Sequence, residues 1–264
     1  MFDFIQLIRN ENMKIYRRPR TWVMLGILLV LTLAPSVLMM TLPDAGPDSM
    51  WSAFPVGMAI GFFLVTIYSV VVAAETVAGE FSTGTIKLLM IRPWSRSKIL
   101  LSKYVSVVLF SLLFLLILFV WNYLTTWLMF GGDPTYRVGA DNRSPLSYYM
   151  LQSVYKYISL LMVVTLSFLI STVFRSGSFA IGLAMFMLFA GQGISSLFMM
   201  LGQKWAKYLL FLHMDVSRYL DESVIRIGEL GEFTLSFSLT VLAVYYVVFI
   251  ALTWYIFNKR DIAT

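Results

Sequence analysis

Cysteine is absent from this 264-residue sequence, and histidine occurs once, at His213. Without cysteine the chain can form no disulfide and can hold no zinc or iron–sulfur centre through thiolates. A zinc protease would need paired histidines, and a serine hydrolase would need a histidine base near its serine. An intramembrane aspartyl protease would need two carboxylates inside apolar segments, and every aspartate lies outside them. We therefore expect no catalytic residue, no metal site and no cofactor in this chain.

Charged residues are also scarce, at 13% of the chain, whereas 59% of the residues are hydrophobic. A soluble domain carries about 25% charged residues, so this chain has too few to cover a globular surface. The apolar residues form long runs, and the mean hydropathy is +0.80. These features predict that lipid surrounds most of the protein. The net charge of +6 is then a matter of membrane orientation, and we expect no nucleic-acid partner.

Six apolar stretches are each long enough to cross the hydrocarbon core, which takes about 20 helical residues. The predicted spans cover residues 21–41, 52–74, 99–130, 149–174, 179–201 and 235–257. Residues 1–20 lack the short apolar core and the small-residue cleavage site of a signal peptide, and the first apolar run, from Thr21, is long enough that we expect it to stay in the membrane. The expected fold class is an all-α membrane protein with six transmembrane helices.

The distribution of lysine and arginine predicts the orientation. With both termini in the cytoplasm, 13 of the 20 Lys and Arg residues lie on the inner side, and nine of the 14 Asp and Glu residues lie outside. The opposite orientation would place the cluster Arg17, Arg18 and Arg20 outside. We expect a multi-pass protein of a bacterial plasma membrane with cytoplasmic N- and C-termini.

Two of the connecting segments are amphipathic. In residues 1–20, apolar residues spaced three apart alternate with basic ones, which predicts a helix in the membrane interface that Pro19 ends. The alternative is a disordered basic tail that only sets the topology. In the outer segment 202–234, the residues from Trp205 to Leu212 predict a helix dipping into the interface, with His213 at the surface or in the interface. An ordinary long loop is the alternative there.

The cytoplasmic stretch 75–103 is more ordered than a topological loop requires. Glu75 lies at the inner end of the second predicted span, where an ionisable residue is costly and usually has a partner or a function. Gly84 is expected to break the helix, Thr85 can cap, and Ser95 is placed to cap the third span. The stretch predicts a compact helical hairpin with an apolar face. The alternative is a solvated basic loop.

Together these features resemble the permease subunits of the ABC type-2 exporter family. That family has a glutamate pair, Gly-Thr, a leucine pair, a proline and a basic residue between its second and third spans. The matching residues here are Glu75 and Glu80, Gly84-Thr85, Leu88-Leu89, Arg92-Pro93, Arg96 and Lys103. The motif covers residues 75–103, and the architecture extends the resemblance to the whole chain.

The resemblance implies a role for each segment. Residues 1–20 are similar to the connecting, or elbow, helix, and residues 21–264 to the permease domain. Within that domain, segment 75–98 would be the coupling segment that docks on an ATPase, and segment 202–234 the short extracellular helices. The implied ATPase contacts are Glu75, Glu80, Phe81, Gly84, Thr85, Leu88, Leu89, Arg92, Pro93 and Arg96, with Arg175 and Ser176 in the second inner loop.

The implied function is export of a hydrophobic or amphiphilic substrate, such as a peptide antibiotic or a lipid-like molecule. The sequence has no G-x-x-x-x-G-K-[ST] motif, so ATP and Mg²⁺ are expected on a separate ATPase subunit. Six spans make half a pathway, so we expect a second permease chain, identical or homologous, besides membrane lipid. The alternatives are an ion-gradient-driven secondary transporter, with Pro35 and Pro55 as candidate helix breaks, and a non-transporting regulatory subunit.

Overall fold

The computed structural model of the protein describes residues 2–41, 49–85, 94–139, 141–200, 204–222, 224–226 and 231–259. Within these ranges, six helices are long and apolar enough to cross a membrane, as predicted. They are α2 (Pro19–Thr41), α3 (Met50–Ser82), α5 (Arg96–Phe130), α6 (Pro145–Val173), α7 (Gly177–Met200) and α8 (Leu235–Lys259), and α1 (Phe2–Tyr16) precedes them. The protein is a multi-pass membrane protein of the all-α class, with a short β-hairpin outside the spanning helices.

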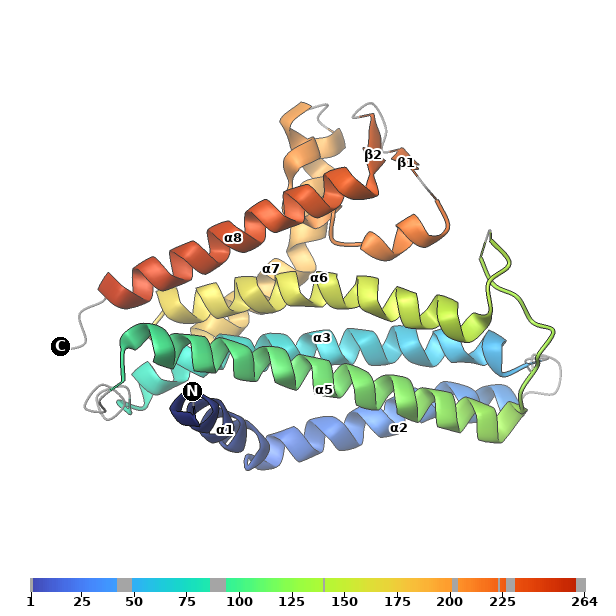
Figure 1. Ribbon diagram of the computed structural model, residues 1–264, viewed down its shortest axis with the longest axis horizontal. Helices are drawn as coiled ribbons and strands as arrows, with labels where there is room; N and C mark the ends of the chain where they lie inside the picture. The colour runs from blue at the N-terminus through green and yellow to red at the C-terminus, as the bar shows by residue number, and fades with distance from the viewer. Residues whose placement is uncertain are drawn as a thin grey trace.

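Helix α3 lies at the centre of the bundle, where it packs against α2, α5, α6 and α7. Helices α3, α5 and α6 run side by side, α8 lies across α6, and α7 leans away from the other helices (Figure 1). In the most apolar 18-residue window of each span, 56% of α3 and α6 is buried, against 17% of α2, α7 and α8. The outer helices thus leave apolar side chains on the surface, as expected where lipid is the solvent.

Two glycines let α3 and α5 approach closely. Gly57 and Gly61 lie one turn apart on α3, where an added Cβ would clash with Asn122 and Leu118 of α5, respectively. Asn122 Nδ2 donates to the carbonyl of Phe54 at 2.8 Å, which ties the two helices together. Small residues at this spacing are a common way to pack transmembrane helices, because they bring the backbones together.

Several helix ends differ from the sequence prediction. Helix α1 ends at Tyr16, and Pro19 is the first residue of α2, where a missing N–H costs nothing. Trp22 Nε1 donates to the carbonyl of Tyr16 at 3.0 Å and so satisfies one group at the end of α1. Pro35 and Pro55 lie inside continuous helices, so neither ends a helix.

The second span also continues beyond its predicted end at Ala74, for about two more turns to Ser82. Glu75 and Glu80 therefore lie within α3. The helix can continue past them because both carboxylates are paired with basic side chains. Gly84 has a φ of 72° just beyond the end of α3, and Ser95 Oγ accepts from Lys98 N at the start of α5. The predicted break and cap are both confirmed.

In the segment before α8, the residues from Trp205 to Leu212 form two short 3-10 helices where one helix was expected. The segment contains three short 3-10 helices, η1 (Lys204–Tyr208), η2 (Leu210–Leu212) and η3 (Val216–Leu220), and an antiparallel hairpin of β1 (Val224–Arg226) and β2 (Glu232–Thr234). We call this segment the cap (Figure 1). Tyr148 of α6 donates to both carboxylate oxygens of Asp221, at 2.8 and 3.0 Å, which fastens the cap to the bundle.

Candidate functional site

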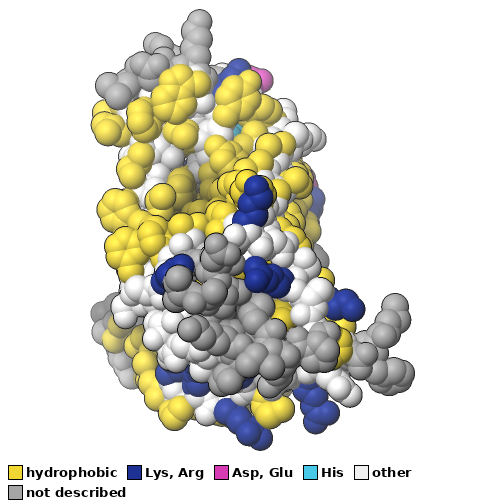
Figure 2. Space-filling model, turned by 90° about the vertical axis from the view of Figure 1, so that its left-hand side faces the viewer, with side chains coloured by type: hydrophobic (Ala, Val, Ile, Leu, Met, Phe, Trp, Pro, Cys, Tyr) yellow, Lys and Arg dark blue, Asp and Glu magenta, His cyan; other side chains and the backbone are white. Residues whose placement is uncertain are grey.

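Helix α1, the last turn of α8, the end of α3 and the start of α7 lie at one end of the molecule, on the left of Figure 1. Figure 2 looks onto this end. Lysine and arginine side chains gather over it, whereas acidic side chains show only at its upper edge. We call it the basic end.

Four charged side chains at the basic end form a closed ring that joins three helices. Lys103 Nζ of α5 donates to Glu11 of α1 at 2.8 Å and to Glu80 of α3 at 2.6 Å. Lys14 Nζ of α1 donates to the same two carboxylates, at 2.6 and 3.0 Å. The Lys103 side chain is only 1% exposed. A buried lysine is tolerated here because two carboxylates and two ammonium groups alternate around the ring.

The ring favours the charged forms of Glu11 and Lys14, its two members on α1. Burial alone would raise the pKa of Glu11, but the ammonium groups of Lys103 and Lys14 outweigh it and lower that pKa. Burial would likewise lower the pKa of Lys14, but Glu11 and Glu80 outweigh it and raise that pKa. Both shifts favour the ionised forms, so the ion pair between Glu11 and Lys14 persists at neutral pH.

A second charged group, the arginine pair, lies beside the ring. Arg18 Nη1 donates to Glu75 Oε1 at 2.9 Å, and Arg20 Nη1 donates to Glu75 Oε2. Both arginines lie at the junction of α1 and α2, and Glu75 lies on α3. Two guanidinium groups thus share one carboxylate, which leaves one positive charge in excess.

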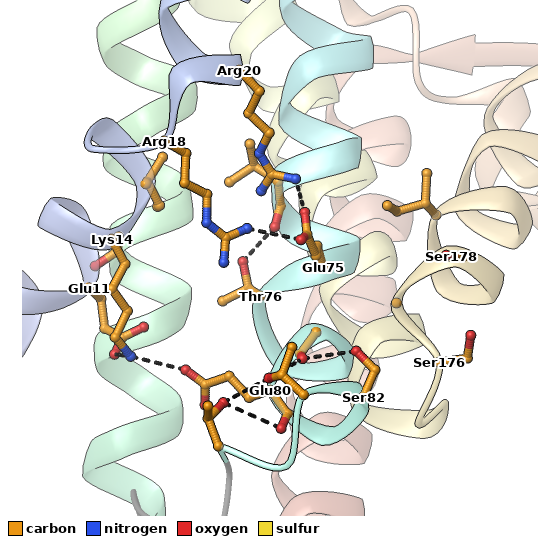
Figure 3. A pocket seen from close by; sticks show the side chains of 18 residues that line it. Glu11, Lys14, Arg18, Arg20, Glu75, Thr76, Glu80, Ser82, Ser176 and Ser178 are labelled. Carbon is orange, nitrogen blue, oxygen red and sulfur yellow. Dashed lines mark hydrogen bonds and ion pairs between the residues drawn. The ribbon is translucent and has the colours of Figure 1, made fainter.

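Three members of the ring, Glu11, Lys14 and Glu80, line a cavity of about 690 Å³ together with the arginine pair and Glu75 (Figure 3). Binding sites for small molecules have volumes of about 300–1,000 Å³, so this cavity is large enough to be one. Ser176 and Ser178, at the connection between α6 and α7, lie across the cavity from Arg18 (Figure 3). The cavity therefore joins the N-terminal helix, the end of α3 and the second inner loop.

The structure brings together four of the predicted contact residues, because Glu75, Glu80, Thr85 and Ser176 all line this cavity. Gly84 and Arg175 are exposed at the same end of the molecule.

Two other predicted contact residues, Phe81 and Arg96, do not line the cavity. Phe81 packs against the apolar cluster around Val77, and Arg96 Nη1 donates to the carbonyl of Asn258 at 3.0 Å. Leu88, Leu89, Arg92 and Pro93, with the apolar run of the predicted hairpin, lie outside the described residues.

Sequence reasoning missed the ring. The spacing of Glu11 and Lys14 by three residues on a helix was visible, and so was Lys103 inside the third predicted span. Neither feature indicates which carboxylate pairs with Lys103, because Lys103 and Glu11 are 92 residues apart in sequence.

His213, expected at the surface or in the membrane interface, is instead buried in the protein, since only 2% of it is exposed. Its Nδ1 lies 2.8 Å from Ser238 Oγ and its Nε2 lies 2.7 Å from the carbonyl oxygen of Lys207. A carbonyl only accepts, so Nε2 carries the proton and Nδ1 accepts from the serine. Tyr219 OH lies 2.7 Å from the same Ser238 Oγ. The neutral imidazole is fully hydrogen-bonded, which explains how the cap can bury it.

The cap is therefore expected to lose stability in mild acid. Burial lowers the pKa of His213 below its ordinary value of 6.5. At a pH between the lowered pKa and 6.5, this histidine is protonated in the unfolded chain but not in the folded chain. The free energy of unfolding therefore decreases as the pH falls below about 6.5. Above that pH the effect is absent. Thermal unfolding in detergent from about pH 7.5 to about pH 5 should show a smaller loss for His213→Asn than for the wild type, and an equal loss would contradict this assignment.

Comparison with known proteins gives the family. Residues 24–263 match the family described as "Protein of unknown function (DUF2705)". The chain belongs to this family. The match covers the six spanning helices except for the first residues of α2. Helix α1 and the arginine pair precede the matched range.

Two relatives from Bacillus subtilis (strain 168) match nearly the whole chain. The "Uncharacterized protein YhcI" is 33% identical over 98% of this chain and 99% of its own length. The "Uncharacterized membrane protein YdbK" is 27% identical over 95% of this chain and 99% of its own length. The name of the second relative agrees with the six spanning helices of the DUF2705 chain.

Proposed function

We propose that this DUF2705 protein is the permease subunit of an ABC exporter, located in the plasma membrane with both termini in the cytoplasm. One observation carries the proposal. Helix α1, the end of α3 with the start of α5, and the loop between α6 and α7 share the basic end of the molecule (Figures 1 and 2). These are the three segments that the resemblance assigns to the cytoplasmic side, and basic residues favour that side of a membrane.

The ring supports a coupling role for the end of α3. Lys103 and Glu80 join α5 to the last turns of α3, and Glu11 joins both to α1. Segment 86–93 follows directly after these turns. A force on that segment would therefore act on three helices at once, through contacts that are both packed and ionic. A separate ATPase subunit, which binds ATP and Mg²⁺, would supply the force.

The surface of the bundle suits an apolar cargo and a second permease chain. The spanning windows of α2, α7 and α8 are only 17% buried, so these helices offer apolar faces to lipid and to a partner. We propose that two such chains, identical or homologous, form the pathway, and that the cargo is hydrophobic or amphiphilic.

Co-purification in detergent with the ATPase encoded beside this chain tests the proposal. Glu80→Ala is a poor probe, because it leaves the buried Lys103 with fewer partners. Arg92→Glu and Arg175→Glu are better, since Arg92 belongs to the motif and Arg175 is exposed. Each is expected to lower the amount of retained ATPase about tenfold, and to lower ATP hydrolysis with it. Arg137→Glu, an exposed arginine at the opposite end, is the matched control and should change neither.

An ATPase that does not co-purify, or that is retained fully by both variants, would count against the exporter. Transport in vesicles that depends on an ion gradient, without any ATPase, would then favour a secondary transporter. A chain that transports nothing in either assay would favour a regulatory subunit.

A further inference from the structure

The charged residues that line the cavity, together with the buried Lys103 behind them, carry one positive charge in excess. The ring is neutral, because Glu11 and Glu80 are balanced by Lys14 and by Lys103 behind them. The arginine pair is not, because Glu75 alone faces two guanidinium groups. The excess charge thus lies on Arg18 and Arg20.

Both arginines have donors to spare. The Arg18 side chain is 49% exposed and the Arg20 side chain 34%, and each donates to Glu75 through Nη1. Arg20 Nε has no acceptor among the described residues. A guanidinium group has five N–H donors in a planar fork, so an oxyanion in the cavity would find several of them.

The wall of the cavity becomes apolar toward the membrane. Val72 lies one turn before Glu75 on α3, and Ile181 lies about one turn after Ser178 on α7. Because α3 ends and α7 begins at the basic end, both apolar residues lie deeper than the charged ones (Figure 1). The cavity therefore offers cations and hydroxyl groups at its mouth and an apolar wall further in.

We propose that this cavity binds a phosphate ester, with the phosphate on Arg18 and Arg20 and an apolar chain along Val72 and Ile181. Arginine forks pair with phosphate oxygens in bidentate fashion. The arginines lie between an amphipathic helix and the first span, at the depth where lipid phosphates are concentrated. The phosphate belongs either to the headgroup of an anionic phospholipid or to a soluble phosphate ester. The proposal does not depend on the exporter assignment.

The test compares lipid retention in the full chain and its variants. The protein is placed in phosphatidylcholine nanodiscs with and without phosphatidylglycerol, and the retained lipids are counted by native mass spectrometry. Glycerol 3-phosphate is the soluble probe, and its binding is followed by the thermal unfolding midpoint. We expect the wild type to retain phosphatidylglycerol in preference to phosphatidylcholine. The double variant R18Q/R20Q should bind it about tenfold more weakly or worse.

Two further variants separate binding from folding. Arg17→Gln removes one arginine charge from an exposed neighbour outside the cavity. It should leave the retention of phosphatidylglycerol unchanged. Glu75→Gln removes the competing carboxylate and frees both arginines, so it should strengthen binding. A loss of binding in Glu75→Gln equal to that in R18Q/R20Q would show a purely structural group and overturn the proposal.

The soluble probe identifies the source of the phosphate. If glycerol 3-phosphate competes as well as the lipid does, the ligand is a soluble phosphate ester held by Arg18 and Arg20, and the apolar part of the proposal, along Val72 and Ile181, is overturned. If it does not compete while phosphatidylglycerol is retained, the ligand is a lipid. A wild type that shows no preference for phosphatidylglycerol and no response to glycerol 3-phosphate overturns the proposal.

Discussion

Replacing Lys103 by methionine is expected to lower the free energy of unfolding by about 3–5 kcal/mol. Lys103 is 1% exposed and bridges Glu11 and Glu80, so the variant leaves two mostly buried carboxylates with Lys14 as their remaining cation. The loss is large because the negative charges stay in a place that water reaches poorly. Unfolding followed in detergent by intrinsic fluorescence would measure it.

Two variants control for packing. Lys14→Met removes a lysine of the same ring whose side chain is 40% exposed, and we expect it to cost about 1 kcal/mol or less. Adding Glu11→Gln and Glu80→Gln to Lys103→Met should restore part of the stability, because the uncompensated charges are gone. If the triple variant is as unstable as Lys103→Met alone, the lysine acts through packing and the ionic account is wrong.

Acid should reduce the difference between the wild type and Lys103→Met. The lysines lower the pKa of Glu11 from its ordinary value of 4.5, so the folded chain holds this proton less tightly than the unfolded chain does. The stability from this group is therefore fully present above about pH 4.5 and is lost as the pH falls through the lowered pKa. Unfolding measured at several pH values would show the two curves converging.

Replacing Gly57 by alanine is expected to destabilise the bundle by about 1–3 kcal/mol. The new Cβ would clash with the Asn122 side chain, and that side chain cannot move freely because its Nδ2 donates to Phe54 O. The two central helices would have to separate or give up this hydrogen bond. Thermal unfolding in detergent provides the measurement.

Gly26→Ala is the matched control for this effect. Gly26 also lies in a spanning helix, but an added Cβ there would meet nothing within 4 Å. Since alanine favours helix over glycine by about 1 kcal/mol, this variant should be neutral or slightly stabilising. The double variant Gly57→Ala/Asn122→Ala should lose less stability than the sum of the losses of the two single variants. Strict additivity would mean that the two positions do not meet.

Local features of the fold were largely predictable. Ser95 and Gly84 were recognised as a cap and a break from residue type alone, because capping needs only a nearby hydroxyl and a left-handed backbone needs only a missing Cβ. The end of α3 was misplaced because a carboxylate such as Glu75 ends a span only where it has no partner. The partner comes from another helix, and the sequence does not show which.

The candidate site was predictable only in part. The motif drew attention to Glu75 and Glu80, and both line the cavity. Nothing in the sequence indicated that Glu11 and Lys14 join a ring with residues of other helices, and His213, expected at the surface or in the interface, is buried. Each error concerns what surrounds a polar group rather than where the group lies in the chain.

The sequence by itself determined that lipid surrounds this protein and how many spans it has. Both follow from composition and run length, because a helix enters hydrocarbon on the sum of its own side chains. Only the tertiary structure decided that Lys103 is neutralised by Glu11 and Glu80, that Arg18 and Arg20 share Glu75, and that a cavity opens between them. The cost of a buried charge depends on its neighbours within a few ångströms, and folding alone brings those neighbours together.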